Sequence, residues 1–286
     1  MIQVPEGITE RTVQLDEVNI HYYEAGQGDE PVILLHGGGV DSALISWSDI
    51  IPGLAQYHRV IAPDLPGYGK SDRPDVEYSL EYYRDFLCRF MDALQIESAS
   101  LVGLSLGGGT ALAFVLQHPH KVKKLVLVDT YGLMSRIPFH FLSYLYVITP
   151  LNDFSYWLMS HSRSLVRQML LAGLIYDPQN ATPELVDLVY QALRQPGAGK
   201  SFKSFQRSEV GPRRLRSDFS DRLGEIKAPT LLVHGDHDSS VPLECVRRAQ
   251  KALPDGRLVV LKNRRHWPMR ENPQEFISIV LDFLRE

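Results

Sequence analysis

Apolar and polar positions along the chain form short strand-like runs separated by longer helix-like runs. Near the start, Thr12–Leu15 and Asn19–Tyr23 have the pattern of the two strands of a β-hairpin. Later runs are compact and apolar without polar alternation, which is typical of parallel strands covered on both faces. We expect these strands at Pro31–Leu35, Arg59–Ala62, Ser98–Val102, Val122–Val128, Thr230–Val233 and Arg257–Leu261.

Helical periodicity separates these strands. Apolar residues recur at helical spacing over Ser79–Leu94, and helix-like runs also cover Leu106–His118 and Leu243–Leu253. Asn272 followed by Pro273 is a start signal for a final helix. Strands that alternate with helices predict an α/β fold with a mostly parallel sheet covered by helices.

This alternation is interrupted in the middle of the chain. From about Gly132 to Ser217 the sequence is rich in aromatic residues and helix-like, with few strand signals. An insertion of helices after the Val122–Val128 strand accounts for this stretch. We therefore predict a first core segment at 1–131, a helical cap at 132–217 and a second core segment at 218–286.

Composition changes this picture little. The chain has 286 residues, of which 44% are hydrophobic and 22% charged, and its net charge of -4 gives no reason to expect a nucleic-acid partner. Cys88 and Cys245 lack metal-ligand spacing and indicate a reducing compartment. The first residues do not resemble a secretory signal, and Pro150 interrupts the most apolar stretch. We expect a cytoplasmic protein without a membrane span, and the sequence does not predict its oligomeric state.

Ser105 is the first candidate for catalysis. It is the central residue of a Gly-Leu-Ser-Leu-Gly segment that joins a strand-like run to a helix-like run. A sharp strand-to-helix turn strains the serine backbone, and side chains two residues away would collide, so glycine is expected there. The turn exposes the hydroxyl above the sheet, next to the N–H groups and dipole of the following helix. This pattern predicts a serine nucleophile that attacks carbonyl groups.

A serine nucleophile also needs a base to take its proton and a third group to orient that base. His266 follows the last strand and precedes the final helix, which makes it the predicted base. The acid is expected after the Thr230–Val233 strand, where Asp236 and Asp238 both qualify by spacing. Asp129, after the preceding core strand, is a third candidate.

A run of three glycines follows His36 and leaves the backbone N–H groups uncovered. The N–H of Gly38 or Gly39, together with that of Leu106, is expected to bind the oxyanion of a tetrahedral intermediate.

Together these motifs resemble cap-bearing members of the α/β-hydrolase superfamily. The resemblance rests on the segments His36–Gly39, Asp64–Ser71, Gly103–Gly108, Gly235–Asp238 with Val241 and Pro242, and His266. In such proteins the aspartate of a Gly-x-x-Asp turn with Val-Pro following it resembles the acid of the triad. The resemblance therefore implies Asp238 as the acid beside Ser105 and His266.

The resemblance also narrows the chemistry. Capped relatives that open epoxides or remove halides carry an aspartate where this chain has Ser105. Relatives that hydrolyse carbon–carbon bonds usually carry asparagine before the nucleophile and methionine after it, where this chain has Leu104 and Leu106. We therefore predict a serine hydrolase that cleaves a carboxylic ester or related activated acyl compound with an apolar acyl part. The alternatives are hydrolysis of a carbon–carbon bond in a vinylogous diketone and a ligand receptor of low turnover.

Three other patterns carry less weight. The segment at 69–71 resembles the end of a nucleotide phosphate loop, but Asp64 stands where that loop needs a glycine. Histidines and aspartates at 234–238 suggest a metal, but a triad explains them, and we expect neither a metal nor a cofactor. The basic stretch at 194–216, with Glu209 as its one acid, is expected to be a solvated face.

Overall fold

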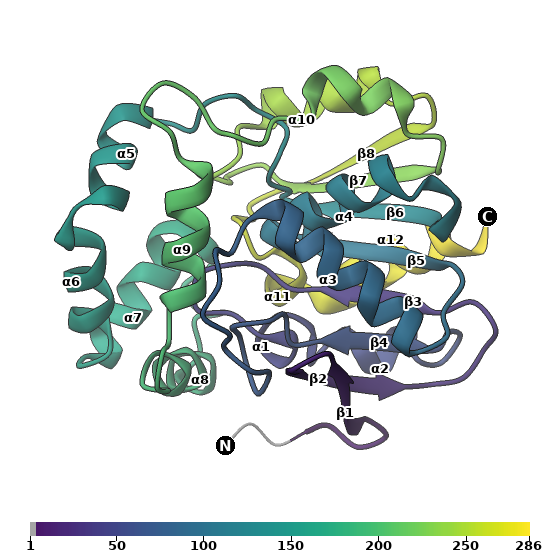
Figure 1. Cartoon of the computed structure of the whole chain (residues 1–286), viewed down its shortest axis with the longest axis horizontal. Helices are drawn as coiled ribbons and strands as arrows, with labels where there is room; N and C mark the ends of the chain where they lie inside the picture. Colours follow the sequence, from purple (N-terminus) through teal and green to yellow (C-terminus); the bar gives the residue numbers. More distant parts are fainter. Residues whose placement is uncertain (1–3) are drawn as a thin grey trace.

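The computed structural model describes residues 4–286, which form one eight-stranded sheet (Figure 1). Its strand order is β1-β2-β4-β3-β5-β6-β7-β8. β2 pairs antiparallel with β1 and β4, and all other neighbours are parallel. The strands are β1 (Thr9–Leu15), β2 (Val18–Ala25), β3 (Val32–Leu35), β4 (Val60–Pro63), β5 (Ala99–Leu104), β6 (Val122–Val128), β7 (Thr230–Gly235) and β8 (Gly256–Leu261). The predicted α/β fold with a mostly parallel sheet is confirmed.

Burial explains why the strands could be read from the sequence. β3, β4, β5 and β7 are buried at every position, so both faces of these strands are apolar and no alternation appears. β1 lies at the edge of the sheet and is exposed over most of its length. The predicted hairpin and all six predicted core strands are present.

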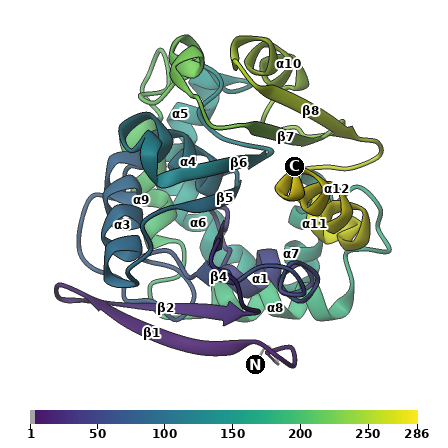
Figure 2. The same cartoon turned by 90° about the vertical axis from the view of Figure 1, so that its right-hand side faces the viewer.

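Helices cover both faces of the sheet (Figure 2). One face carries α3 (Leu80–Ala93), α4 (Leu106–Gln117) and α10 (Leu243–Ala252), and the other carries α1 (Ala43–Trp47), α2 (Ile51–Leu54), α11 (Pro268–Glu271) and α12 (Pro273–Arg285). The predicted start of the last helix is confirmed, because the Asn272 side chain accepts a hydrogen bond from the Glu275 N–H at 3.3 Å.

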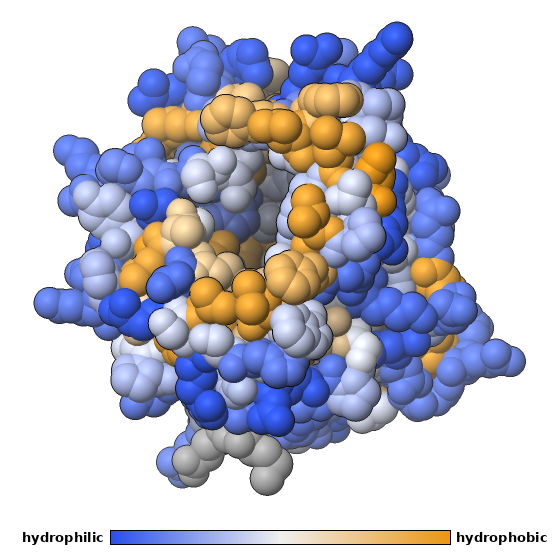
Figure 3. Space-filling model, turned by 90° about the vertical axis from the view of Figure 1, so that its left-hand side faces the viewer, coloured by the Kyte–Doolittle hydropathy of each residue, from blue (hydrophilic) through white to orange (hydrophobic). Residues whose placement is uncertain are grey.

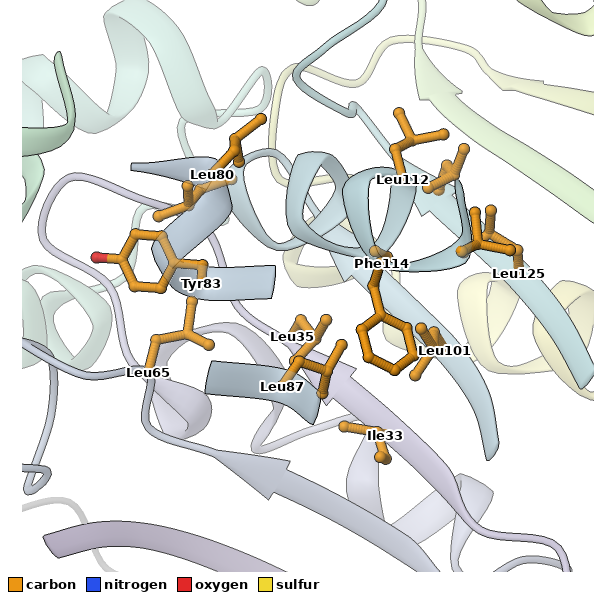
Figure 4. Packing of buried hydrophobic residues seen from close by; sticks show 14 of the residues in the cluster. Ile33, Leu35, Leu65, Leu80, Tyr83, Leu87, Leu101, Leu112, Phe114 and Leu125 are labelled. Atoms are coloured by element: carbon orange, nitrogen blue, oxygen red, sulfur yellow. The ribbon is translucent and has the colours of Figure 1, made fainter. Parts of the chain in front are cut away.

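The core on one face of the sheet fixes the turn that follows β5. Leu112 and Phe114 of α4 pack with Tyr83 and Leu87 of α3 and with Leu101 of β5 (Figure 4). All five side chains are fully buried. Because α4 and β5 are both held in this core, the residues that join them have little freedom to move.

Between β6 and β7 the chain forms five further helices, which we call the cap helices. They gather on the left of Figure 1, beyond one end of the sheet. They are α5 (His140–Ile148), α6 (Pro150–Met159), α7 (Arg163–Met169), α8 (Pro183–Leu193) and α9 (Lys200–Glu209), and a short π-helical stretch, Leu170–Leu174, follows α7. The division of the chain at 131/132 and 217/218 stays a prediction.

The outer surface of the cap helices carries apolar side chains around a hollow (Figure 3). Phe139 is 81% exposed, and Leu142, Leu151 and Trp157 are each more than half exposed. Within residues 4–286, none of the helices is both long and apolar enough to cross a membrane. The exposed apolar side chains lie on the short helices α5 and α6 and on Phe139, which precedes α5.

Candidate active site

Ser105 stands at the turn between β5 and α4. Its backbone angles, φ 49° and ψ −111°, are rarely adopted by a residue with a side chain. The Ser105 N–H donates to the Val128 carbonyl at 2.9 Å, and its own carbonyl accepts from the N–H groups of Gly109 at 2.9 Å and Tyr131 at 3.1 Å. These bonds tie the turn to β6 and α4, so the surroundings hold the strained conformation in place.

Close backbone packing explains the glycines around this serine. A Cβ atom on Gly107 would lie 2.2 Å from the carbonyl oxygen of Leu35. A Cβ atom on Gly103 would lie 2.5 Å from the carbonyl oxygen of Gly107. Backbone atoms cannot turn aside as a flexible side chain can, so the predicted need for glycine at both positions is confirmed.

His266 is paired with Asp238. Its Nδ1 atom lies 2.9 Å from Asp238 Oδ2, and the Asp238 side chain is fully buried. A carboxylate can only accept, so Nδ1 carries the proton and Nε2 keeps a free lone pair. Asp236, the other candidate by spacing, accepts from the Arg264 N–H at 3.3 Å and is exposed.

The electrostatics of this pair favour a charged imidazole during catalysis. Burial alone lowers the pKa of His266, but the charge of Asp238 and its hydrogen bond outweigh burial and raise that pKa above 6.5. Burial likewise raises the pKa of Asp238, but the charge and hydrogen bond of His266 hold it below its usual value. The aspartate therefore stays ionised and would stabilise an imidazolium if His266 took up a proton.

Asp129, the third candidate acid, lies beside a different histidine. Its Oδ1 atom is 2.7 Å from Nδ1 of His234 and accepts from the Gly235 N–H at 3.1 Å. Burial raises the pKa of Asp129 to about 6, against the hydrogen bond and charge of His234. Polar atoms of Asp129, His234 and Asp238 lie within 4.8 Å of one another, but His234 Nε2 already bonds the Val241 carbonyl at 3.1 Å. Asp129 Oδ2 has no hydrogen-bond partner among the described residues, so contacts within the protein account for only part of this cluster, and the expectation of a metal-free site stays a prediction.

The glycine run after β3 borders the active-site cavity. The Gly37 N–H is already used, because it donates to Asp41 Oδ2 at 2.8 Å. In residues 4–286, no hydrogen bond within the protein uses the N–H groups of Gly38 or Gly39. Leu106 is the first residue of α4, and N–H groups at the start of a helix have no partner within it. These three N–H groups, the ones expected from the sequence, are therefore available to an oxyanion.

Two buried aspartates hold the chain around this glycine run. Asp41 accepts from the Gly37 N–H and from the Ser46 hydroxyl at 2.7 Å. Asp64 accepts from the Ala43 N–H at 2.9 Å, at the start of α1. Carboxylates that accept several short bonds rigidify a loop, so the N–H groups beside them are held in place before a substrate arrives.

Ser105 and His266 line one cavity of about 370 Å³ between the sheet and the cap helices. Its wall is mainly apolar, but α6 contributes Asn152, and α9 contributes Gln206 and Glu209. Asn152 and Glu209 are fully buried. The prediction that the 194–216 stretch is a solvated face is therefore wrong at Glu209, because this side of α9 packs against the core. The sequence does contain a signal for the burial of Glu209, because helical spacing places Glu209 on the same side of the helix as Phe202.

Glu271 connects the His266 loop to the cap. Its Oε1 atom accepts from the Arg265 N–H at 2.9 Å. Its Oε2 atom accepts from the N–H groups of Tyr176 at 2.9 Å and Asp177 at 3.0 Å. The sequence gives no sign of this role, because two of the three partners of Glu271, the N–H groups of Tyr176 and Asp177, lie 95 and 94 residues away along the chain.

Comparison with known families agrees with this architecture. A family model described as the alpha/beta hydrolase fold matches residues 30–273. The protein belongs to the α/β-hydrolase family, which confirms the resemblance seen in the sequence motifs.

Relatives match almost the whole chain. A 2-hydroxy-6-oxo-6-phenylhexa-2,4-dienoate hydrolase of Comamonas testosteroni is 35% identical over 303 residues, covering 100% of both chains. A 2-hydroxy-6-oxo-2,4-heptadienoate hydrolase of Pseudomonas putida is 32% identical, covering 94% of this chain and 92% of its own. The crystal structure of a meta-cleavage product hydrolase from Pseudomonas fluorescens IP01 has a TM-score of 0.81 at 32% identity, covering 96% and 97% of the two chains.

These relatives overturn the prediction of a carboxylic ester hydrolase. They are named as hydrolases of 2-hydroxy-6-oxo-dienoates, in which the 6-oxo carbon is bonded to carbon and not to an ester oxygen. Ester hydrolysis and carbon–carbon hydrolysis both begin at a carbonyl, so a serine, histidine and aspartate do not distinguish them. Leu104 and Leu106, which argued against the second reaction, are two buried apolar residues beside the nucleophile and do not exclude it.

Proposed function

We propose that the protein is a serine hydrolase that cleaves the carbon–carbon bond beside the 6-oxo carbon of a 2-hydroxy-6-oxo-dienoate. One observation carries the proposal: Ser105 and the Asp238-paired His266 line the same largely apolar cavity. The names of the full-length relatives support the choice of substrate.

In the first half of the reaction, Ser105 is the nucleophile. His266 Nε2 removes the hydroxyl proton as the oxygen attacks the 6-oxo carbon. Asp238 holds the imidazole in the required tautomer and stabilises its charge. The N–H groups of Leu106 and of Gly38 or Gly39 bind the oxyanion.

In the second half, the carbon–carbon bond breaks. The proton of the 2-hydroxyl group first moves to the carbon beside the 6-oxo group, so this carbon leaves as an enolate conjugated with the new 2-oxo group. His266 returns its proton to that enolate. Water, activated by His266, then releases the acyl group from Ser105. The sum is the addition of one water, which gives a carboxylic acid and a 2-hydroxydienoate.

The test is to follow the loss of the coloured dienoate in the presence of the purified protein. The 6-phenyl and 6-methyl dienoates are the first substrates to use. We expect turnover by the wild type, a loss on the order of 10⁴-fold or more in Ser105→Ala, and little change in the matched exposed-serine variant Ser164→Ala. No consumption of either dienoate by the wild type, or full activity in Ser105→Ala, would contradict the proposal.

A further inference from the structure

Helix α5 turns its apolar side away from the core. Phe141, Leu142, Leu145 and Ile148 are exposed, and their spacing places them on one side of the helix. Within α5, all of which the structure describes, only Val147 is buried. A surface helix normally packs its apolar side against the core, so α5 has the reverse arrangement.

Helix α6 follows α5 directly and has the same arrangement. Leu151, Phe154, Trp157 and Leu158 are exposed on one side of α6, and of its ten described residues only Asn152 is buried. We call the exposed apolar side chains of α5 and α6 the outer apolar face. Figure 3 shows apolar side chains gathered on the side of the molecule where Figure 1 places these two helices. Exposed apolar surface that is gathered in this way is typical of a binding surface.

Arginines border the outer apolar face. Arg136 Nε donates to the Arg213 carbonyl at 2.9 Å, and Nε2 of His140 lies 2.9 Å from the Gly211 carbonyl. The turn that contains Gly211 and Arg213 therefore lies beside the start of α5. Arg136, Arg213 and Arg214 are exposed, and none of the three forms an ion pair with an acidic side chain of residues 4–286.

These arginines lie around a depression in the surface. The depression has a volume of about 330 Å³, and Arg207, Arg213, Arg214 and Arg216 line it. Arg207 and Arg216 each have an acidic partner at 3.4 Å, so their charges are partly neutralised. Arg213 and Arg214 keep their charge for a ligand, and guanidinium groups match the oxygen atoms of a phosphate.

Charge distinguishes two kinds of occupant for this surface. Asp153 is the one acidic residue in the sequence of α5 and α6, and it pairs with Lys203 at 2.5 Å. A second copy that packed the same face against this one would bring two sets of arginines into one interface without an unpaired acid to receive them. An anionic membrane offers phosphates to the arginines and an apolar interior to the outer apolar face.

We infer that the protein binds to the surface of anionic membranes through α5 and α6. The outer apolar face inserts below the lipid headgroups, and Arg213 and Arg214 contact lipid phosphates. With nine and ten residues, α5 and α6 are too short to cross a membrane, so they lie along its surface. Tyr146 and Tyr156 of the same two helices line the active-site cavity, so binding of this kind brings the cavity close to the lipid.

Co-sedimentation of the whole chain with lipid vesicles tests the inference. Vesicles of phosphatidylcholine alone are compared with vesicles in which about one third of the lipid is phosphatidylglycerol. We expect binding to the anionic vesicles to be at least tenfold tighter, and to weaken as the salt concentration rises from about 0.1 M to about 0.5 M. Binding to neither kind of vesicle, or equal binding to both, overturns the inference.

A pair of arginine substitutions tests the charged part of the surface. Arg213→Gln combined with Arg214→Gln should weaken binding to anionic vesicles at least tenfold. The matched control is Arg247→Gln combined with Arg248→Gln, which changes another adjacent and exposed pair, on α10. The control should bind as the wild type does. If the two double variants bind equally well, the inference is overturned.

Trp157 tests the apolar part. Trp157→Ser should weaken binding to anionic vesicles at least tenfold, whereas Tyr57→Ser should not, although each ring is 55% exposed. Because Trp47 and Trp267 are buried, a blue shift of tryptophan emission on vesicle binding reports the insertion of Trp157. Binding without such a shift means that another surface meets the lipid, and it overturns the inference. If Trp157→Ser does not fold, the arginine pair and the emission of the wild type decide.

Analytical ultracentrifugation without lipid identifies the other occupant. We expect the arginine double variant and Trp157→Ser to have the same sedimentation coefficient as the wild type. If the wild type instead forms dimers that Trp157→Ser abolishes, and it does not bind vesicles, the outer apolar face is an interface between two copies and the inference is wrong.

Discussion

Ser105 and Phe139 have nearly the same positive φ, 49° and 51°. Their surroundings differ, because backbone atoms enclose the Ser105 turn and solvent surrounds the Phe139 side chain. The Ser105 turn is enclosed by backbone, so closely that a Cβ atom on Gly107 would come within 2.2 Å of a carbonyl oxygen. Phe139 precedes α5, has no side-chain hydrogen bond that caps the helix, and is 81% exposed. Strain in the first case is imposed by packing around a residue that lines the cavity, whereas the second residue is exposed to solvent.

The two walls of the cavity also differ in how firmly their residues are held by neighbouring groups. The sheet side contributes Ser105 and His266, which tight turns and buried partners hold in place. The cap side contributes Asn152 and Glu209, which lie on helices and have unpartnered oxygens. The two walls therefore differ in how their polar groups are satisfied: His266 on the sheet side has a partner within the protein, whereas one oxygen of Asn152 and one of Glu209 on the cap side have none within residues 4–286.

Alanine substitution at two glycines tests the difference in packing and gives the largest expected effect. Gly107→Ala should lower the free energy of unfolding by about 3 kcal/mol, because the new Cβ atom meets backbone that cannot move aside. Gly173→Ala, in the cap, has nothing within 4 Å of its Cβ atom and should change that free energy by no more than about 1 kcal/mol, toward greater stability. Chemical denaturation of both variants checks this, and equal losses at the two positions would break the comparison.

The pH dependence of kcat/KM tests whether activity depends on the protonation of His266, on the sheet side, or on that of Glu209, on the cap side. His266 must be neutral to accept the serine proton, so activity is present above its pKa and is lost as the pH falls through it. That pKa is raised, so the acid limb should lie above pH 6.5 and activity should fall about tenfold for each pH unit below the limb. Burial also raises the pKa of Glu209, but this group lies on the cap. Glu209→Gln should therefore leave the acid limb at the same pH as in the wild type. An acid limb at or below pH 6.5 in the wild type, or an acid limb that moves in Glu209→Gln, would contradict the assignment of this limb to His266.

Most of the sheet side could be predicted from the sequence, because its signals are local. Glycines two residues either side of Ser105, and the loop position of His266, follow from what a single turn requires. The choice of Asp238 over Asp236 did not follow from spacing, since either carboxylate could turn toward the histidine. The resemblance to the family implies Asp238, and in the structure it is the Asp238 carboxylate that lies 2.9 Å from Nδ1 of His266.

The cap side was harder to predict, because burial there depends on which helix faces meet. Glu209 lies in a basic stretch and looks solvated in the sequence, yet it is fully buried against Tyr131. Asn152 is also buried, in a helix that is otherwise mostly exposed. The substrate class is hard to predict for a different reason. Leu104 and Leu106 count against carbon–carbon hydrolysis in the sequence, but ester and carbon–carbon cleavage share the same first step, and the relatives favour the latter.

The smallest expected effect concerns the backbone at Phe139. Asparagine tolerates a left-handed conformation better than phenylalanine does, so Phe139→Asn should raise the free energy of unfolding by about 0.5–1 kcal/mol. The matched variant is Phe141→Asn, which also removes an exposed ring but lies within α5. It should lower that free energy by about 0.5 kcal/mol, because the ring contact with Tyr144, with 6.4 Å between centroids, is lost. Thermal and chemical denaturation of the pair give the sign of each change. Opposite signs show that the backbone conformation governs the first site. If both variants gain stability equally, removal of an exposed apolar ring explains the result, and the strain at Phe139 makes no measurable contribution.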